Sequence, residues 1–477
     1  MILSRTTLSR LFHRLLSLNC CHGKQQQERG LYKVSFKRNS PKRMQTVTLE
    51  NQYQRLMESA APLSKFPYET QLEIKRCALM TALKKVVNIV KHNRVGAFTS
   101  EMEKMAEQNQ GCICPLLDMM PSPKPEGFRN KEELNIWLGA NGDPNTVGLM
   151  IGRGESGLCV PNDQLLNTKP LHNEVVKTFK SFLAQSKFKR RDPDRNDITA
   201  HWSKVLIRSN EQGHVMLVPD LSCRQITQEV VDEAKEELRS YYSSGLQMLH
   251  GVHSLFMRVR RRGNKTHHHQ YHICGDTHIY EEVLGYKFRI SPEAFFQLNT
   301  PGAEVLYSVV QNLFKDRNVE MVLDIGCGTG TIGVVTSSLV NRVIGLDVIK
   351  QAIEDAEFNA DLNGVSNASF HVGSARALLK SFMADGSILT DETVAIVNPN
   401  RNGLNKKAIL RLRCCKAIKH LIFISCKPHG NAVVNFADLI VPERVDHPGQ
   451  PFKAVQAVGV DMFPQTIHSE LVLLFQR

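Results

Sequence analysis

The second half of the chain alternates short apolar runs with longer amphipathic stretches. Five runs are expected to be strands: Met321–Ile325, Arg342–Leu346, Ala368–Val372, Val394–Val397 and Leu421–Ser425. Two further runs, near Ala454–Val460 and Leu471–Phe475, close the pattern. Alternation of strands with helices is typical of a parallel sheet that is covered by helices on both faces. The pattern therefore predicts a Rossmann-like α/β domain over residues 289–477, with an antiparallel end.

The preceding region has a different pattern. Leu72 to Ile89 has helical periodicity, and Ile226 to Leu238 reads as a charged helix. Shorter runs are expected to be strands: Val147–Ile151, Lys204–Arg208, His214–Pro219, Ser254–Arg258 and Gln270–Cys274. The loop 210–213 between two of them ends in glycine, as in a hairpin. We interpret residues 46–288 as a mixed α/β region that binds the substrate.

Charge is concentrated at the N-terminus. Residues 1–49 carry a net charge of +9 out of a total of +13, which leaves +4 for the remaining chain. The overall charge is therefore only a weak indication of RNA binding. The strongest local basic patches are Lys187–Arg191 and Arg258–Arg262 with Lys265, where phosphate contacts could position RNA. A solvated charge run is the alternative interpretation of each patch.

The first 45 residues have the composition of a targeting segment. No acidic residue precedes Glu28, and on a helix the leucines would share one side while Arg10 and Arg14 lay on the other. We expect residues 1–45 to be a presequence that directs the protein to the mitochondrial matrix; a disordered basic tail is the alternative. No apolar run is long enough for a transmembrane helix. The twelve cysteines include no Cys-x-x-Cys pair, so we expect no structural metal.

A glycine-rich turn follows the first strand of the Rossmann-like domain. Asp324 is followed by Gly326, Gly328 and Gly330, and Asp347 ends the next strand. Glycines allow a tight turn and a close approach of the backbone to a ligand, while a carboxylate at the second strand can accept both ribose hydroxyls. A plain helix-opening turn or a nicotinamide-dinucleotide site could share part of this pattern. The spacing of the glycines favours a smaller nucleoside, S-adenosylmethionine.

Three further segments are expected at the same edge of the sheet. They carry Asn398 and Arg401 after the fourth strand, Cys426 after the fifth, and Glu470 before the last. Methylation of uridine at C5 needs a nucleophile that adds to C6 and a base that removes the C5 proton. Cys426 and Glu470 could supply these groups, and Arg401 could stabilise the enolate oxygen or hold a phosphate. Taken singly, a buried cysteine is usually inert and a glutamate that opens a strand is usually solvated.

Five motifs, in this order, resemble those of the RNA uracil-5-methyltransferases: Arg289–Asn299, Asp324–Gly330, Asn398–Arg401 with Gly403, Ser425–Pro428, and Phe463–Glu470. The resemblance covers residues 200–477 well and the earlier part loosely. It implies a class I methyltransferase fold, S-adenosylmethionine as cofactor and tRNA as partner. The expected target is the T-loop uridine at position 54, with an rRNA uridine as a further candidate.

The resemblance also implies roles for individual residues. Those expected to bind the cofactor are Gln297, Asp324, Gly326, Gly328, Gly330, Asp347 and Asn398. Cys426 would be the nucleophile and Glu470 the proton acceptor. The family usually has Asp-Pro-Pro-Arg where this chain has Asn398 to Arg401, and Cys-Asn-Pro where Lys427 stands. These departures motivate a second hypothesis, a non-catalytic RNA-binding or folding factor that retains the fold.

Overall fold

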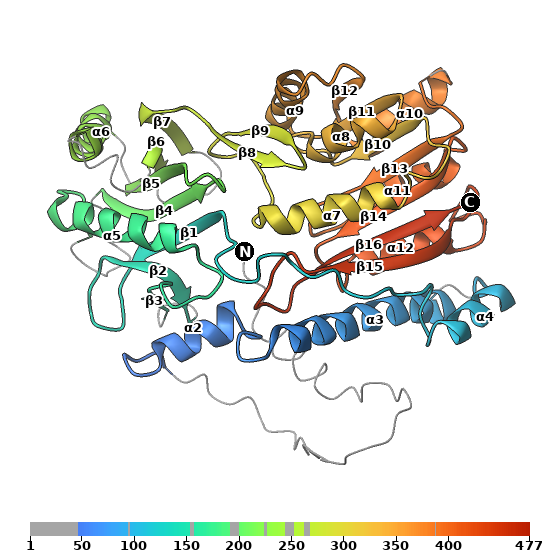
Figure 1. Cartoon of the computed structure of the whole chain (residues 1–477), viewed down its shortest axis with the longest axis horizontal. Coiled ribbons are helices and arrows are strands. Elements are labelled where there is room, and N and C mark those ends of the chain that lie inside the picture. Colours follow the sequence, from blue (N-terminus) through green and yellow to red (C-terminus); the bar gives the residue numbers. More distant parts are fainter. Residues whose placement is uncertain are drawn as a thin grey trace, which may run out of the picture.

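A computed structural model describes residues 46–93, 96–152, 157–190, 200–223, 227–243, 252–261, 268–386 and 388–477. The expected presequence, residues 1–45, lies outside the described residues. Two seven-stranded sheets lie side by side, and a hairpin of β8 (Ile279–Val283) and β9 (Tyr286–Ile290) stands between them (Figure 1). None of the described helices is both long enough and apolar enough to cross a membrane.

The second sheet, here called the catalytic sheet, has the order β12-β11-β10-β13-β14-β16-β15. Its strands are β10 (Met321–Ile325), β11 (Arg342–Asp347), β12 (Ala368–Val372), β13 (Thr393–Val397), β14 (Ile418–Ser425), β15 (Lys453–Val460) and β16 (Glu470–Gln476). β10 to β14 pair in parallel, whereas β16 runs antiparallel to both of its neighbours. The predicted Rossmann-like domain is thus confirmed, together with its antiparallel end.

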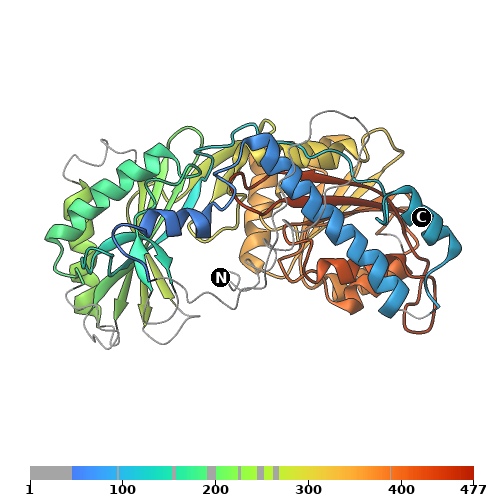
Figure 2. The same cartoon turned by 90° about the horizontal axis from the view of Figure 1, so that it is seen from below.

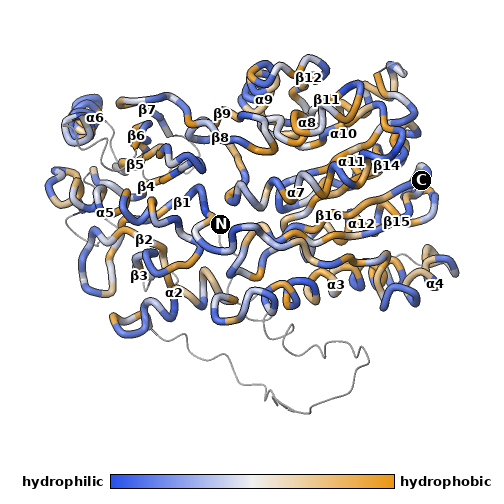
Figure 3. The backbone as a smooth tube through the Cα atoms, in the orientation of Figure 1, coloured by the Kyte–Doolittle hydropathy of each residue, from blue (hydrophilic) through white to orange (hydrophobic). Residues whose placement is uncertain are grey.

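Helices cover both faces of the catalytic sheet: α7 (Thr300–Asn312), α8 (Thr331–Thr336), α9 (Lys350–Leu362), α10 (Ala375–Asp385), α11 (Lys406–Cys414) and α12 (Ala432–Ile440). Since successive side chains of a strand point to opposite faces, each strand contributes side chains to two cores. In β10, Leu323 belongs to the core under α10, α11 and α12, and Val322 to the core under α7, α8 and α9, which we call the α7 core. Figure 3 shows apolar residues concentrated along β14, β16 and α12.

The first sheet, here called the central sheet, has the order β3-β2-β1-β4-β5-β6-β7. Its strands are β1 (Lys131–Trp137), β2 (Thr146–Ile151), β3 (Leu158–Val160), β4 (His201–Ser209), β5 (Val215–Cys223), β6 (Val252–Arg261) and β7 (His268–Gly275). α5 (Pro170–Gln185) and α6 (Gln228–Ser243) pack on one face around Phe182 and Trp202. The predicted β4–β5 hairpin is confirmed. β1 and the β8–β9 hairpin were not predicted.

The N-terminal helices reach the other sheet. α2 (Gln52–Ala60) lies by β2 and β3, whereas α3 (Tyr68–Asn93) packs against α12, and α4 (Ser100–Gln108) follows it. Figure 2 shows α3 crossing the catalytic domain. Leu116 and Met120 then form parallel bridges to Ala457 and Val460 of β15. Residues 46–288 therefore contribute to the cores of both sheets, because α3 and the segment after it complete the catalytic domain.

Candidate active site

The glycine turn after β10 requires glycine at two positions. Gly326 has φ +83°, and a Cβ atom there would lie 2.8 Å from the carbonyl oxygen of Asn398, at the end of the neighbouring strand β13. Gly330 has φ +78°, and its Cβ would lie 2.9 Å from that of Ala356 on α9. L side chains rarely adopt this left-handed region. The turn can therefore lie close to Asn398 and α9 only because Gly326 and Gly330 have no side chain.

Asp324 lies beneath this turn and is fully buried. Its Oδ2 accepts a hydrogen bond from the backbone N–H of Gly333 at 3.0 Å. Its Oδ1 has no hydrogen-bond partner among the described residues. Burial raises the pKa of this carboxyl to about 7, and the nearby Asp347 acts in the same direction. A buried acceptor without a partner is unfavourable unless a ligand or water satisfies it, which fits a polar ligand at this turn.

Asp347, at the end of β11, faces the same turn. Its Oδ2 accepts from the N–H of Gly328 at 3.1 Å, and its Oδ1 from the N–H of Ile349 at 3.0 Å. The carboxylate is thereby oriented, with lone pairs left for a diol. Val348, Ile349 and Val372 are exposed beside it by 66%, 59% and 49%. A carboxylate next to exposed apolar side chains suits a ribose carrying an aromatic base, so the residues present fit S-adenosylmethionine.

Gln297 precedes α7 and is buried. Its backbone carbonyl accepts from Nδ2 of Asn130 at 2.8 Å, and its side chain hydrogen-bonds with Tyr307 of α7. The pKa of Tyr307 is raised by burial and by the nearby Asp324 and Glu470. Tyr307 thus links the expected cofactor side to the expected base. Tyr307 was not predicted from the sequence, where the one signal was a hydroxyl in the apolar stripe of α7.

Cys426 and Glu470 belong to adjacent antiparallel strands. The last registered pair of β14 and β16 is Ser425 with Leu471, so Cys426 and Glu470 are the next residues on each side. On β14 the alternation of Ile422 and Ile424 in the α7 core continues to Cys426. On β16, Glu470 precedes Val472 and Leu474 of the same core. Because residues two apart share a face, both side chains point toward the α7 side of the sheet.

Electrostatic interactions join these two residues to Arg401. Burial raises the pKa of the Cys426 thiol to about 11; Glu470 adds to the rise, and a hydrogen bond and the positive charge of Arg401 oppose it. Burial likewise raises the pKa of Glu470 to about 8, again opposed by Arg401. Oε2 of the buried Glu470 carboxyl has no hydrogen-bond partner among the described residues. Arg401 therefore favours the anionic form of both groups, as a thiolate nucleophile and a carboxylate base require.

All ten residues singled out from the sequence lie around the carboxyl edge of the catalytic sheet. Those on the cofactor side follow or end β10, β11 and β13 or precede α7, while Arg401, Cys426 and Glu470 gather around β13, β14 and β16. Among the described residues, no group of three or more His, Cys, Asp or Glu side chains could hold a metal ion.

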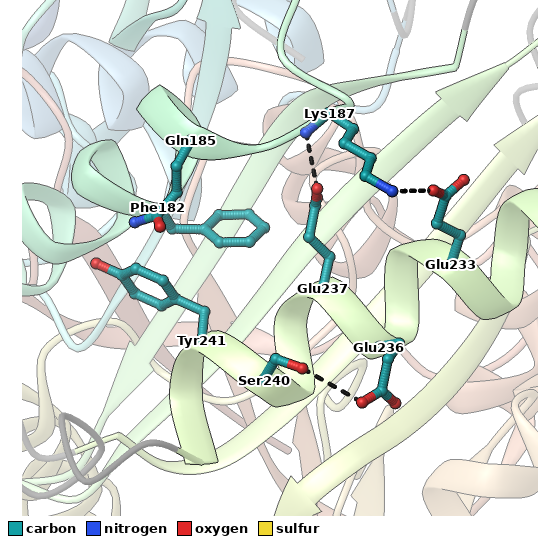
Figure 4. Close-up of a pocket in the computed structure, with 8 residues that line it drawn as sticks. All are labelled: Phe182, Gln185, Lys187, Glu233, Glu236, Glu237, Ser240 and Tyr241. Atoms are coloured by element: carbon teal, nitrogen blue, oxygen red, sulfur yellow. Dashed lines mark hydrogen bonds and ion pairs between the residues drawn. The ribbon is translucent and has the colours of Figure 1, made fainter.

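A cavity of about 550 Å³ lies between α5 and α6, away from this edge (Figure 4). Three glutamates line it, and Lys187 is engaged with two of them: its Nζ pairs with Glu233 at 2.5 Å and its backbone N–H donates to Glu237 at 2.7 Å. An acidic lining is unfavourable for RNA phosphates. The cavity contains none of the expected site residues.

The basic patches are largely engaged within the protein. Arg258 and Arg260 both pair with the buried Asp220, at 2.6 and 2.7 Å. The guanidinium of Arg190 stacks 3.7 Å from the ring centre of Trp137. Arg191, Arg262 and Lys265 lie outside the described residues. A paired guanidinium has fewer donors left for phosphate, so Arg258 and Arg260 are less available to RNA than an isolated arginine would be. RNA contact by these patches stays a prediction.

Comparisons with known proteins show which families this chain is similar to. Residues 316–435 match the family of methyltransferase domains. The tRNA (uracil-5-)-methyltransferase homolog B of Danio rerio is 38% identical over 433 residues, which cover 89% of this chain and 87% of that relative. The homolog B of Mus musculus is 35% identical and covers 89% of this chain and 86% of its own length.

The fold of this chain is also similar to that of a protein with a known crystal structure. Pyrococcus abyssi tRNA (uracil-54, C5)-methyltransferase in complex with S-adenosyl-L-homocysteine is 22% identical, with a TM-score of 0.59, and the match covers 87% of this chain and 84% of that one. The fold alone follows from this likeness. The identity to the homolog B proteins over nine-tenths of the chain confirms the family suggested by the motifs: the chain belongs to the tRNA (uracil-5-)-methyltransferase family.

Proposed function

We propose that this protein methylates C5 of the T-loop uridine at position 54 of mitochondrial tRNA, with S-adenosylmethionine as methyl donor and through a covalent bond between Cys426 and C6. The observation that carries the proposal is the convergence of Cys426, Glu470 and Arg401 at the edge of the catalytic sheet that also carries the glycine turn. The names of the relatives and of the archaeal structure support a tRNA uridine as the target. An rRNA uridine is a further candidate substrate.

The chemistry follows from what each side chain can do. The Cys426 thiolate adds to C6, and the electron pair of the C5–C6 bond moves toward C5 and the O4 enolate. S-adenosylmethionine, when bound, supplies an electrophilic methyl group to C5. The Glu470 carboxylate then removes the C5 proton, the C5–C6 double bond re-forms, and the Cys426–C6 bond breaks. Arg401 favours the anionic forms of both protein groups and can stabilise the enolate oxygen.

Because the pKa of the Cys426 thiol is high, the thiol must lose its proton before it can add to C6. At neutral pH most of the Cys426 thiol in the free protein is protonated, since its pKa is about 11. Glu470, with a pKa of about 8, is mostly neutral under the same conditions. A neutral Glu470 does not oppose the thiolate, because its effect on Cys426 is that of its negative charge. The uracil that is methylated must also leave the base stack of the RNA to reach the carboxyl edge of the sheet.

The covalent step is tested with RNA that carries 5-fluorouridine at the target. Fluorine at C5 cannot be removed as a proton, so the wild-type protein should remain bound to this RNA through denaturing electrophoresis. Cys426→Ala should form no adduct and should abolish methylation of normal RNA, while RNA binding persists. Cys414→Ala is the matched control, because this partly buried thiol ends α11 at the opposite end of the sheet from Cys426. Methylation by Cys426→Ala would refute the assignment.

The location and the RNA are tested in cells. A fluorescent reporter fused to residues 1–45 should enter mitochondria, and a diffuse cytosolic reporter would contradict matrix targeting. Mapping of 5-methyluridine in mitochondrial tRNA and rRNA, with and without the protein, identifies the substrate. Loss at tRNA position 54 is the expected result. The second hypothesis, a non-catalytic RNA-binding factor motivated by Asn398 and Lys427, gains support only if the wild type also shows no methylation of any RNA.

A further inference from the structure

The first turns of α3 carry polar residues on its buried side. Leu72, Leu79 and Leu83 face the catalytic domain at helical spacing. Gln71 and Lys75 are also buried, with exposed fractions of 1% and 0%. A buried ammonium group is unfavourable unless it is paired and hydrogen-bonded. Apolar residues would suit a helix whose only task is packing, so these two residues need another explanation.

Lys75 contacts the start of the segment 461–469, which joins β15 to β16. Its Nζ lies 2.6 Å from Oδ1 of Asp461, and both side chains are fully buried. The same Nζ donates to the carbonyl oxygen of Phe463 at 2.9 Å. Asp461 Oδ1 also accepts from the N–H of Phe463 at 3.1 Å. One lysine of α3 thus fixes the first three residues of this segment.

Gln71 contacts the middle of the same segment. Its Nε2 donates to Oε1 of Gln465 at 3.0 Å, and the Gln465 backbone N–H donates to Oε1 of Gln71 at 2.9 Å. The Gln465 carbonyl accepts from the N–H of Leu63 at 3.0 Å. Gln465 has φ +68°, a left-handed conformation that is uncommon outside glycine. The bonds to Gln71 and Leu63 hold this residue where its local preference would not.

The segment is also bonded to the cofactor side of the site. Nδ2 of Asn299, at the start of α7, donates to the carbonyl oxygen of Met462 at 3.2 Å and to Oγ of Ser122 at 3.0 Å. The hydroxyl of Tyr68 on α3 accepts from the N–H of Ser122 at 2.8 Å. The residues before Glu470 are therefore held between α3 and the start of α7.

We propose that Gln71 and Lys75 are positioning residues for the general base: by holding the segment 461–469, they set where β16 begins and so where the Glu470 carboxyl lies relative to Cys426. The inference rests on the proposed function, because it assumes that Glu470 removes the C5 proton. It explains why a helix far upstream in the sequence completes the catalytic domain. It also assigns a task to Phe463 and Gln465 of the fifth motif, which is to bind α3.

Loss of these contacts should slow one particular step of the reaction, the removal of the C5 proton. If the segment shifts, addition of Cys426 and methyl transfer can still occur, but removal of the C5 proton slows. A protein–RNA adduct that already carries the methyl group should then accumulate on normal uridine RNA. Lys75→Met and Gln71→Leu should show this adduct, labelled from a radioactive methyl donor, and should release 5-methyluridine roughly 10- to 100-fold more slowly than the wild type. Glu73→Gln, exposed on the same helix, should behave as wild type.

A double variant separates positioning from stability. Lys75→Met leaves the Asp461 charge buried without its partner and should lower the thermal stability. Adding Asp461→Asn removes that charge, so stability should recover in part, while the labelled adduct should still accumulate because the contact from Lys75 to Phe463 is absent. Parallel recovery of stability and product release in the double variant would overturn the positioning role. So would wild-type release by both single variants, or slow release without any adduct. If the wild type forms no adduct with 5-fluorouridine RNA, the proposed function itself fails, and the positioning role with it.

Discussion

Cys426 and Glu470 lie on neighbouring antiparallel strands, each one residue beyond the last registered pair of β14 and β16. The hydrogen bonds of the sheet therefore fix the register of these two residues, and sites on strands hold their geometry more precisely than sites on loops do. On each strand, the side chain stands at the end of a row of apolar side chains that belongs to the α7 core. The edge of a buried sheet thus presents two reactive groups in a desolvated environment, which raises the pKa of both.

Glu470→Gln should uncouple methyl transfer from product release. The amide cannot accept the C5 proton, while Cys426 and the cofactor site are unchanged. An RNA adduct that contains the transferred methyl group should therefore persist through denaturing electrophoresis on unmodified uridine RNA. Wild-type protein turns over and should show little of it. A variant that releases 5-methyluridine at the wild-type rate would exclude Glu470 as the base.

The same substitution should alter the pH dependence of stability. Below the usual carboxyl pKa of about 4.5, Glu470 is protonated in both the folded and the unfolded chain. As pH rises, the unfolded chain releases this proton, whereas the folded chain keeps it until about pH 8. The folded state therefore loses relative stability across this window, by about 1.4 kcal/mol for each pH unit that separates the two pKa values when the effect is fully expressed.

The Glu470→Gln variant should not lose stability in this way as pH rises, because it has no carboxyl group at this position. The melting temperature of the variant minus that of the wild type should grow between about pH 5 and pH 8 and then level off. Thermal unfolding of the cofactor-free proteins measures the difference, and Glu73→Gln, on an exposed face of α3, controls for the removal of a carboxyl group. A difference that is constant with pH would mean that the folded protein does not hold this proton.

Arg401→Met should move the pH–rate profile. The guanidinium lowers the pKa of Cys426 and of Glu470, so its removal should raise both and move the rising limb of the profile to higher pH. A pKa that rises by one pH unit lowers the ionised fraction of that group at neutral pH by about tenfold. Arg401→Lys keeps the charge and should recover part of the rate. An unchanged profile with a lower maximum would instead assign Arg401 to binding of the RNA.

Asp347→Ala should weaken S-adenosylmethionine binding. Loss of hydrogen bonds to a charged acceptor costs roughly 1.5–3 kcal/mol, which is about tenfold or more in affinity. Asp347→Asn retains one acceptor oxygen and should be intermediate, and Asp361→Ala, exposed on α9, should bind normally. Titration calorimetry provides the dissociation constants. Equal affinities for wild type and Asp347→Ala would remove this residue from the cofactor site.

The sequence determined the features that depend on local pattern. Strands buried on both faces are apolar nearly throughout, which is why β10, β13 and β14 could be located, and a tight turn such as the one at Gly326 needs glycine. The edge of the sheet followed from this alternation, and with it the grouping of Cys426 and Glu470.

Only the tertiary structure decided which distant surfaces meet. Periodicity predicted a helix near Leu72 to Ile89 but not the domain on which it lies, and Lys75 stands 386 residues from Asp461 in the chain. The basic run near Arg258 was likewise predicted to contact RNA, but Arg258 and Arg260 pair with Asp220 on the neighbouring strand. Burial and ion pairing between segments depend on the packing of the whole chain, and no local pattern records them.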